Sequence, residues 1–321
     1  MSGERELLQR LIAGPLSGDT LAKEAGLTRA AMWKRIEALR EAGVEIDAQP
    51  GRGYALRHPL QLLDADAIAA ALPVAANARV AALEVAWSLD STNSELLRRD
   101  TPAQGAAVLL AERQTGGRGR RGRVWTSPLA AHLYLSVARQ YSGGLARLGG
   151  LSLVAGVAVA QALRYAGHAQ VQLKWPNDLV VGDRKLGGLL VEGGGEHAGP
   201  VRAVIGLGLN VRMPEAAASG IDQPWIDLAS LESSPSRNLL AAAVLEHLLP
   251  ALDRFDVEGL APFQQPYEQL DALHGREVAV QLGDQAQSGR ALGIAADGAL
   301  RVEIDGMERL FHSGEVSVRR Q

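Results

Sequence analysis

The segment ERQTGGRGRRGRVW, residues 112–125, lies between two apolar runs, AAVLLA at 106–111 and LYLSVAR at 133–139. Short apolar runs bounded by polar and glycine-rich stretches predict buried β-strands. Four arginines fall within residues 118–123 and are interleaved with glycines. Glycine lets a backbone approach a ligand closely, and neighbouring guanidinium groups suit phosphate and carboxylate oxygens. The segment therefore predicts an anion-binding loop between two strands of a folded domain.

Glycine–arginine runs more often form disordered RNA-binding tails or solvated basic loops. Here the run occurs once and is enclosed by strands, so we interpret it as a loop that orders when an anion binds. Trp125 follows directly. Its ring suits stacking on an adenine as well as it suits the interior of the protein.

The pattern on either side of this loop indicates three domains in a chain of 321 residues. Residues 1–60 combine short amphipathic helices with a hairpin, and residues 61–270 mix strands with helices. Residues 271–321 hold short alternating strands around two Asp-Gly turns. We expect an α+β protein with an N-terminal winged helix-turn-helix, a central mixed β-sheet with helices and a small C-terminal β-barrel.

Apolar periodicity in the central domain predicts its individual elements. We expect helices at 94–99, 148–166 and 238–255, and strands at 107–111, 133–138, 171–173, 179–181, 189–192 and 201–207.

Composition excludes several classes of chemistry. The chain has no cysteine, which rules out disulfides, thiolate metal sites and cysteine nucleophiles. Its seven histidines are scattered without ligand spacing, so we predict no protein-built metal site. The formal charge of −3 gives no global attraction to nucleic acid. The N-terminus is a poor signal peptide and the most apolar stretch, 148–163, is too short to span a membrane. We expect a soluble, cytoplasmic chain.

Residues 18–43 have the layout of a helix-turn-helix, and the segment PGRGY at 50–54 would be the wing. Thr28 is placed to cap the second helix of this helix-turn-helix, which is the third helix of the chain. Thr28 and Arg29 suit contacts to bases. The same helix carries a basic face for phosphates, made of Arg29, Lys34, Arg35 and Arg40. The alternative is a small helical domain for protein contacts.

Three further motifs follow the arginine loop. KWPND at 174–178 and RKLGGLLVE at 184–192 place polar residues between apolar strands, and VIGLGLNV at 204–211 ends a strand with glycines and an asparagine. A structural turn alone would explain 176–178, and the Gly-x-Gly pattern is weak by itself. Lys185 opens a predicted strand, from which its ammonium can reach the arginine loop.

In combination these motifs resemble the catalytic domain of biotin–protein ligases. The resemblance rests, in the family's order, on Ser91-Thr92-Asn93, 117–125, 174–178, 184–188 and 206–210. The terminal segments are similar to those of the family member that doubles as biotin operon repressor. The resemblance thus implies a class II synthetase-like ligase domain and an SH3-like C-terminal barrel. Many members carry alanine at the position of Gly187, so we expect looser packing there.

The resemblance also implies a reaction. Biotin and ATP, with Mg²⁺, would form biotinyl-5′-AMP, which then acylates a lysine of the biotin carboxyl carrier protein of acetyl-CoA carboxylase. Ligand would drive the chain to form a homodimer that binds operator DNA through residues including Thr28, Arg29, Lys34 and Arg35.

Site residues are carried over from the same resemblance. Biotin would be bound by Ser91, Thr92, Asn93, Gln114, Arg118, Gly119, Arg120 and Lys185. ATP and the adenylate would be bound by Arg121, Trp125, Lys174, Asn177 and Asn210. Catalysis would fall to Lys185, Arg118, Arg120 and Asp178. Asp178 either orients or deprotonates the incoming lysine or only stabilises its turn.

Three other functions compete with this interpretation. A lipoate–protein ligase shares the fold and the adenylate chemistry, and substrate competition would separate the two. A transcription factor that only senses a ligand would bind it without turnover of ATP. A structural scaffold would leave the arginine loop unexplained.

Overall fold

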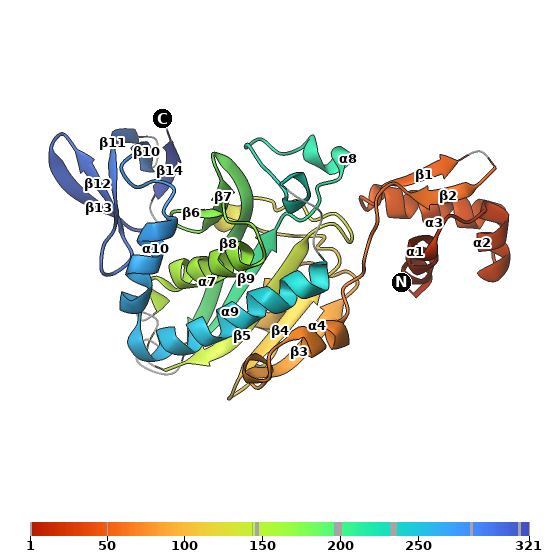
Figure 1. Cartoon of the computed structure of the whole chain (residues 1–321), viewed down its shortest axis with the longest axis horizontal. Coiled ribbons are helices and arrows are strands. Elements are labelled where there is room, and N and C mark those ends of the chain that lie inside the picture. The colour runs from red at the N-terminus through yellow and green to blue at the C-terminus, as the bar shows by residue number, and fades with distance from the viewer. Residues whose placement is uncertain are drawn as a thin grey trace.

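The fold was analysed in a computed structural model that describes residues 2–49, 51–142, 144, 148–195, 201–231, 236–282, 285–313 and 316–320. Figure 1 shows three units side by side: a helical N-terminal module, a central sheet with helices, and a C-terminal sheet. A narrow linker joins the N-terminal module to the rest of the protein. This arrangement confirms the predicted α+β class.

The N-terminal module is a helix-turn-helix followed by a hairpin. Its elements are α1 (Ser2–Ala13), α2 (Gly18–Glu24), α3 (Arg29–Glu41), β1 (Ile46–Gln49) and β2 (Gly53–Leu56). Ser17 and Thr28 cap α2 and α3, because their hydroxyl oxygens accept hydrogen bonds from Thr20 N at 3.0 Å and Ala31 N at 3.2 Å. Met32, Ile36 and Leu39 bury one face of α3. The predicted cap and layout are confirmed.

The central unit is a mixed seven-stranded sheet in the order β3-β4-β5-β9-β8-β7-β6, in which only β3 and β4 run parallel. Its strands are β3 (Val80–Ala86), β4 (Ala106–Ala111), β5 (Leu133–Tyr141), β6 (Gln172–Lys174), β7 (Asp178–Val181), β8 (Arg184–Gly195) and β9 (Val201–Leu209). Its helices are α4 (Ala65–Ala71), α5 (Val74–Asn77), α6 (Thr92–Arg98), α7 (Leu151–Tyr165), α8 (Glu215–Ala218) and α9 (Arg237–Glu258).

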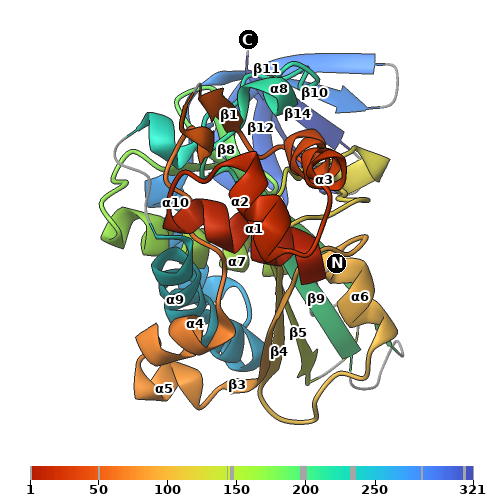
Figure 2. The same ribbon diagram turned by 90° about the vertical axis from the view of Figure 1, so that its right-hand side faces the viewer.

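Helices cover both faces of this sheet, and α6 and α9 lie on opposite sides of it (Figure 2). In α7 every residue from Leu153 to Ala160 is buried, because the helix lies between the sheet and α9. No helix in the described part of the chain is long and apolar enough to cross a membrane.

The predicted elements are present, with shifted ends. The strand expected at 189–192 is the centre of β8, which runs from Arg184 to Gly195. The sequence pattern did not reveal the full length of β8, because its glycines are unfavourable in a strand. In the structure β8 pairs with β7 on one side and with β9 on the other. The sequence pattern did not predict α4, α5 or β3. The edge strand β3 is alanine-rich and its side chains are at least partly exposed, so it carries little apolar alternation.

The C-terminal unit is a five-stranded antiparallel sheet in the order β13-β12-β11-β10-β14. The helix α10 (Gln264–Leu270) leads into β10 (Glu277–Leu282), β11 (Gln285–Ile294), β12 (Leu300–Ile304), β13 (Met307–Phe311) and β14 (Val316–Arg320). Its buried residues belong to the same hydrophobic core as the central unit. Trp175 Nε1 donates a hydrogen bond of 3.0 Å to the carbonyl of Gly298, which fixes this sheet beside the 174–178 turn.

The N-terminal module has its own core, into which Leu129 and Ala130 of the central unit insert. Leu129 N donates a 2.8 Å hydrogen bond to the carbonyl of Ala42, directly after α3. Gly43 follows with φ of +103°, and a Cβ atom there would lie 2.6 Å from Pro128 Cβ. The segment after the arginine loop therefore touches the end of α3.

A buried ion pair joins the linker to the central unit. Arg237 Nη2 lies 2.8 Å from Glu112 Oε2, and the two side chains are only 6% and 3% exposed. Arg237 also donates to the carbonyls of His132 and Gln61, and Glu112 Oε1 accepts from Leu63 N. Charges buried this deeply persist only when they are paired and hydrogen-bonded.

Removing one partner should therefore destabilise the fold strongly. We expect Arg237→Leu to lower the free energy of unfolding by about 3–5 kcal/mol, since Glu112 would remain charged and buried. Urea unfolding of the full chain measures this. The double variant E112L/R237L should lose less than the single variant. As a control, Arg254→Leu breaks the exposed pair with Glu258 and should cost about 1 kcal/mol or less. Equal losses for the buried and exposed pairs would contradict the argument.

Candidate active site

The predicted catalytic and ligand-binding residues lie at the start of α6, in the arginine loop, and on or directly beside strands β6, β7, β8 and β9. Ser91 caps α6 through its hydroxyl oxygen, which accepts from Ser94 N at 3.4 Å. Ser91, Thr92 and Asn93 are each at most 5% exposed. A helix start buried in this way places several polar groups inside the protein, where each requires a partner.

The partners of this helix start form a closed polar cluster. Thr92 donates through N and Oγ1 to Gln114 Oε1, at 2.8 and 3.1 Å. The fully buried Ser136 lies with its hydroxyl oxygen 2.7 Å from Thr92 Oγ1 and 2.6 Å from Asn93 Oδ1. The structure thus brings together four of the predicted biotin residues, Ser91, Thr92, Asn93 and Gln114. Their neutral donors and acceptors suit a polar but uncharged group.

The glycines of β9 make room for this arrangement. A Cβ atom on Gly206 would collide with the side chain of Asn93, and one on Gly208 would lie 2.5 Å from Trp125 Cε2. The Gly-x-Gly pattern at 206–208, weak as a motif, therefore has a steric reason. One glycine admits Asn93 and the other admits the indole of Trp125.

The arginine loop is closed at its base and turns tightly at its tip. Trp125 N donates to the carbonyl of Gly117 at 2.9 Å, and Gly119 N donates to that of Arg123 at 2.7 Å. Arg120–Gly122 form one 3₁₀ turn, with Arg121 in the left-handed region at φ of +57°. Left-handed backbone is uncommon for a residue with a side chain and marks a specifically held turn.

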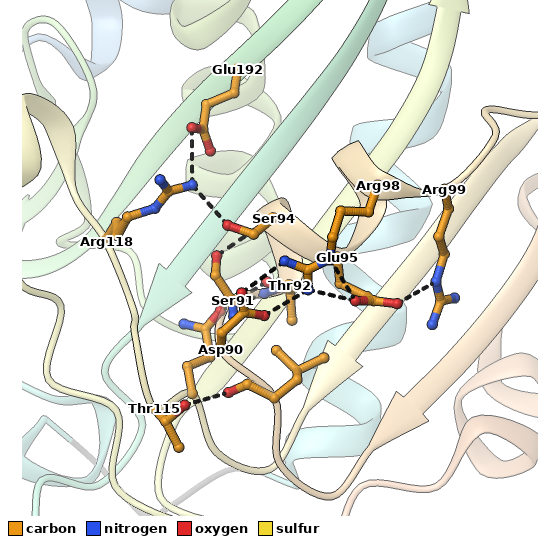
Figure 3. Close-up of polar contacts among 12 residues, drawn as sticks. Asp90, Ser91, Thr92, Ser94, Glu95, Arg98, Arg99, Thr115, Arg118 and Glu192 are labelled. Atoms are coloured by element: carbon orange, nitrogen blue, oxygen red, sulfur yellow. Dashed lines mark hydrogen bonds and ion pairs between the residues drawn. The ribbon is translucent and has the colours of Figure 1, made fainter.

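Two arginines of this loop contact residues from other motifs. Arg118 Nη2 donates to Ser94 Oγ at 2.8 Å and to Glu192 Oε1 at 3.2 Å, as Figure 3 shows. Arg120 Nη1 donates to Asn177 Oδ1 at 3.2 Å. Burial, followed by the nearby charge of Arg121, lowers the pKa of Arg120 from its ordinary value. The charge of Asp178 acts in the opposite direction, and an anion beside Arg120 would likewise favour its charged form.

Lys185 lies between an acid and an aromatic ring. Its Nζ is 2.6 Å from Asp178 Oδ1 and 5.5 Å from the centre of the Trp125 ring. The two charged side chains are 18% and 23% exposed, so solvent screens the pair only partly. The structure therefore brings the predicted Lys185, Asp178 and Trp125 into one group.

Asn177 and Asn210 tie the surrounding backbone together. Asn177 Nδ2 donates to the carbonyl of Leu189 at 2.6 Å, while its oxygen accepts from Arg120. Asn210 is 4% exposed, and its Nδ2 donates to the carbonyls of Ile226 at 3.1 Å and Lys185 at 3.4 Å. Lys174 ends β6, directly opposite Asp178 in the β6–β7 pairing. All three border the Lys185 group.

Two residues of the site were missed by the sequence analysis. Ser136 interrupts the apolar strand LYLSVAR, and a polar residue inside such a run is the signal that could have found it. Glu192 accepts hydrogen bonds from both Asn93, at 2.8 Å, and Arg118. Only the pairing of β8 with its neighbours brings Glu192 to α6, so no local pattern pointed to it.

The expectation for Gly187 was wrong. A Cβ atom there would lie 2.9 Å from the carbonyl oxygen of Gly208 and 3.1 Å from Leu179 Cδ1. Glycine does not loosen this position, because β9 and Leu179 already fill the space. Here the backbones of β8 and β9 approach too closely for a side chain without some shift.

The predicted basic face of α3 is smaller than expected. Thr28, Arg29 and Lys34 are exposed, and Arg29 makes only a loose pair with Asp19 at 3.4 Å. Arg35 is half-buried, with its guanidinium against Gly3 of α1. Arg40 donates to the carbonyl of Ile46 and pairs with Glu37 at 2.6 Å, so it joins α3 to β1. Arg35 and Arg40 are therefore both partly covered by other elements of the module.

Among the residues that the structure describes, no group of three or more His, Asp or Glu side chains is arranged to hold a metal ion. His132 shows how the histidines are used. It is fully buried, its Nδ1 accepts from Val211 N at 3.2 Å, and burial lowers its pKa to about 4. A neutral His132 thus fixes the backbone directly after Asn210.

Comparisons with known proteins match all three units. The model described as "Biotin/lipoate A/B protein ligase family" matches residues 85–210. An "HTH domain" matches residues 4–55, and the "Biotin protein ligase C terminal domain" matches residues 273–319.

Individual relatives extend the likeness. The "Bifunctional ligase/repressor BirA" proteins of Salmonella typhimurium and Escherichia coli are each 42% identical over 94% of this chain, and cover 93% and 92% of their own lengths. The "Biotin--[acetyl-CoA-carboxylase] ligase" of Mycobacterium tuberculosis is 34% identical over 73% of this chain and 88% of its own. The solved structure of the Aquifex aeolicus biotin protein ligase in complex with biotin and ATP is 27% identical, covers 75% of this chain and all of its own, and has a TM-score of 0.64. The chain therefore belongs to the biotin protein ligase family, in its bifunctional ligase/repressor branch.

Proposed function

We propose that the protein activates biotin with ATP and transfers it to a lysine of the biotin carboxyl carrier protein of acetyl-CoA carboxylase. The observation that carries this proposal is the meeting of the arginine loop, Lys185 and Trp125 beside a buried neutral polar cluster. Such a site offers hydrogen bonds to an uncharged ring at one end and cations to acidic groups at the other.

The first step joins two anions. A carboxylate oxygen of biotin attacks the α-phosphorus of ATP, and the bond to the β-phosphate breaks as pyrophosphate leaves. Repulsion between the reacting acids has to be neutralised, which is mainly an electrostatic task. We assign it to Lys185, Arg118 and Arg120, together with the Mg²⁺ that accompanies ATP as substrate. The pairing of Arg118 with Glu192 keeps its guanidinium at the wall of the site.

Substrate binding is divided between the two ends of the site. We assign biotin to Ser91, Thr92, Asn93, Gln114 and Gly119, with Arg118, Arg120 and Lys185 at its carboxylate. The hydroxyl group of Ser136 holds Thr92 and Asn93 in place in this cluster. We assign the adenylate to Trp125, whose ring offers a stacking face, with Arg121, Lys174, Asn177 and Asn210 around it.

In the second step, the amine of the acceptor lysine attacks the carbonyl carbon of biotinyl-AMP. The bond to the phosphate oxygen breaks, AMP leaves, and the amine loses a proton. We propose that Asp178 either accepts this proton or orients the attacking amine. Its pairing with Lys185 places the carboxylate within hydrogen-bond reach of the group that holds the reacting acid.

We further propose a division into residues 1–60 for DNA binding, 61–270 for catalysis and 271–321 as an SH3-like C-terminal unit. Ligand binding would favour a homodimer that represses biotin synthesis genes, because two-fold operators match two-fold proteins. Since ATP, operator DNA and the carrier protein are all substrates or partners, we place the protein in the cytoplasm.

Replacing Lys185 tests the first step. Wild-type protein is expected to catalyse biotin-dependent exchange between ATP and pyrophosphate, and to label a purified carrier domain with biotin only when ATP is present. Lys185→Met should reduce the exchange by about 100-fold or more, because an unneutralised anion remains in the site. Lys23→Met, an exposed lysine on α2, is the matched control. Exchange with lipoate in place of biotin would instead support a lipoate ligase.

Replacing Asp178 separates the two steps. Asp178→Asn should slow transfer from isolated biotinyl-AMP to the carrier lysine by about 100-fold or more, since a proton acceptor is lost. Biotin-dependent pyrophosphate exchange should fall much less. Rapid-quench measurements of each step provide the comparison. Equal losses in both steps would show that Asp178 acts only by holding Lys185.

The DNA-binding proposal predicts that ligand raises the affinity for operator DNA. In a gel-shift assay with the promoter region of the biotin synthesis genes, biotin plus ATP should raise affinity by about 10- to 100-fold. Arg29→Ala should weaken binding and reduce its salt dependence, because a phosphate contact is lost. Arg254→Ala, an exposed arginine on α9, serves as control. Binding that ignores both ligands would leave only the enzyme.

A further inference from the structure

The outward face of α3 carries a tryptophan that neither the sequence analysis nor the proposed site uses. The side chain of Trp33 is 53% exposed, whereas the other four tryptophans of the chain are buried or half-buried. Met32 and Ile36, its neighbours on α3, point into the module core. A single exposed apolar residue needs no explanation by itself, so the surroundings of Trp33 decide its meaning.

Trp33 lines a hollow of about 770 Å³ between α3 and the hairpin. Gly18 and Asp19 at the start of α2 form one wall, and Gln49 and Tyr54 of the hairpin form another. The hollow is firmly built, because Tyr54 and Leu16 exchange two backbone hydrogen bonds, of 2.9 and 3.1 Å. The indole therefore borders a fixed concave surface between the second helix of the helix-turn-helix and the wing.

The charges around the indole favour nucleic acid over a protein partner. Arg29, Lys34 and Arg52 are all exposed on α3 and the wing. Lysine is depleted in the centres of protein–protein interfaces, whereas cations beside a reading helix are typical of contacts to phosphates. The concave face thus has an apolar centre and a rim with three cations and one carboxylate, Asp19, which lies 3.4 Å from Arg29.

Besides Thr28 and Arg29, which suit polar contacts to bases, the same face offers an apolar group for reading them. Its first turns expose Arg29, Ala30, Trp33 and Lys34, and none of these is the asparagine or glutamine that pairs with adenine. Residues in the N-terminal half of a recognition helix contact base edges in the major groove. The only apolar group that the major groove presents is the C5-methyl of thymine. An indole beside a small alanine complements that methyl group.

We propose that Trp33 reads thymine in the major groove by packing its indole on the C5-methyl group, and so sets one base of each operator half-site. This assignment rests on the operator binding proposed above. It concerns specificity, because the cations supply affinity for any sequence, whereas Trp33 discriminates among sequences.

Selection from a random duplex library, with full-length protein, biotin and ATP, identifies the preferred half-site for wild type, W33A and W33F. Wild type should select thymine at a fixed position. Replacing that thymine by deoxyuridine, which removes only the methyl group, should weaken wild-type binding by about fivefold or more. W33F should keep this difference, since a phenyl ring still packs on a methyl group. W33A should lose it and select no fixed base there.

Controls separate a reading role from a folding defect. The thermal unfolding midpoint of W33A should match wild type, because Trp33 is exposed. Tyr165→Ala removes another exposed aromatic ring, on α7, and should leave the selected sequence unchanged. If wild type binds its site equally with thymine and deoxyuridine, or if W33A keeps the thymine preference, the assignment to Trp33 is overturned while operator binding stands. If wild type binds no duplex in the presence of both ligands, the repressor proposal is overturned as well.

Discussion

The geometry of the site depends on how closely side chains can approach the backbone of β9. Gly206 and Gly208 have no Cβ atoms, so Asn93 from α6 and the indole of Trp125 lie directly on the strand. Every other element of the site is arranged around these two contacts. The polar cluster of Thr92, Gln114 and Ser136 surrounds one of them, and Lys185 with Asp178 borders the other. A side chain at either glycine would displace Asn93 or Trp125 from its present position.

The cations of the site differ in how far a neighbouring carboxylate balances their charge. Glu192 pairs with Arg118 and Asp178 pairs with Lys185, so two cations have partners within the protein. Arg120 donates a hydrogen bond to the neutral oxygen of Asn177. Burial and Arg121 disfavour its charge more than the neighbouring Asp178 favours it. The arrangement stores an electrostatic cost that an incoming anion removes. In the reaction proposed above, the charge that would bind the substrate anions is also the charge that would neutralise the reacting acids.

Motifs that are local in sequence were predicted well, whereas contacts between distant segments were not. The strand–loop–strand around 112–125, the turn at 174–178 and the cap at Thr28 follow from the residues themselves. Glu192 could not be recognised, because only strand pairing brings it beside Asn93. Arg35 and Arg40 looked like DNA contacts, since a helical pattern shows charge but does not show that α1 and β1 cover those positions. The same limit hid the tight space at Gly187, which arises from β9 and Leu179.

The contact of Leu129 and Ala130 with the end of α3 makes the N-terminal module and the central unit dependent on each other. Only a few residues separate Trp125 from Leu129, so one short stretch of main chain runs from the arginine loop to the contact with the helix-turn-helix. Deleting the N-terminal module would therefore not yield an unaltered enzyme. It would expose the apolar side chains of Leu129 and Ala130 to water, a few residues after the arginine loop. A shortened protein would need polar residues at these positions.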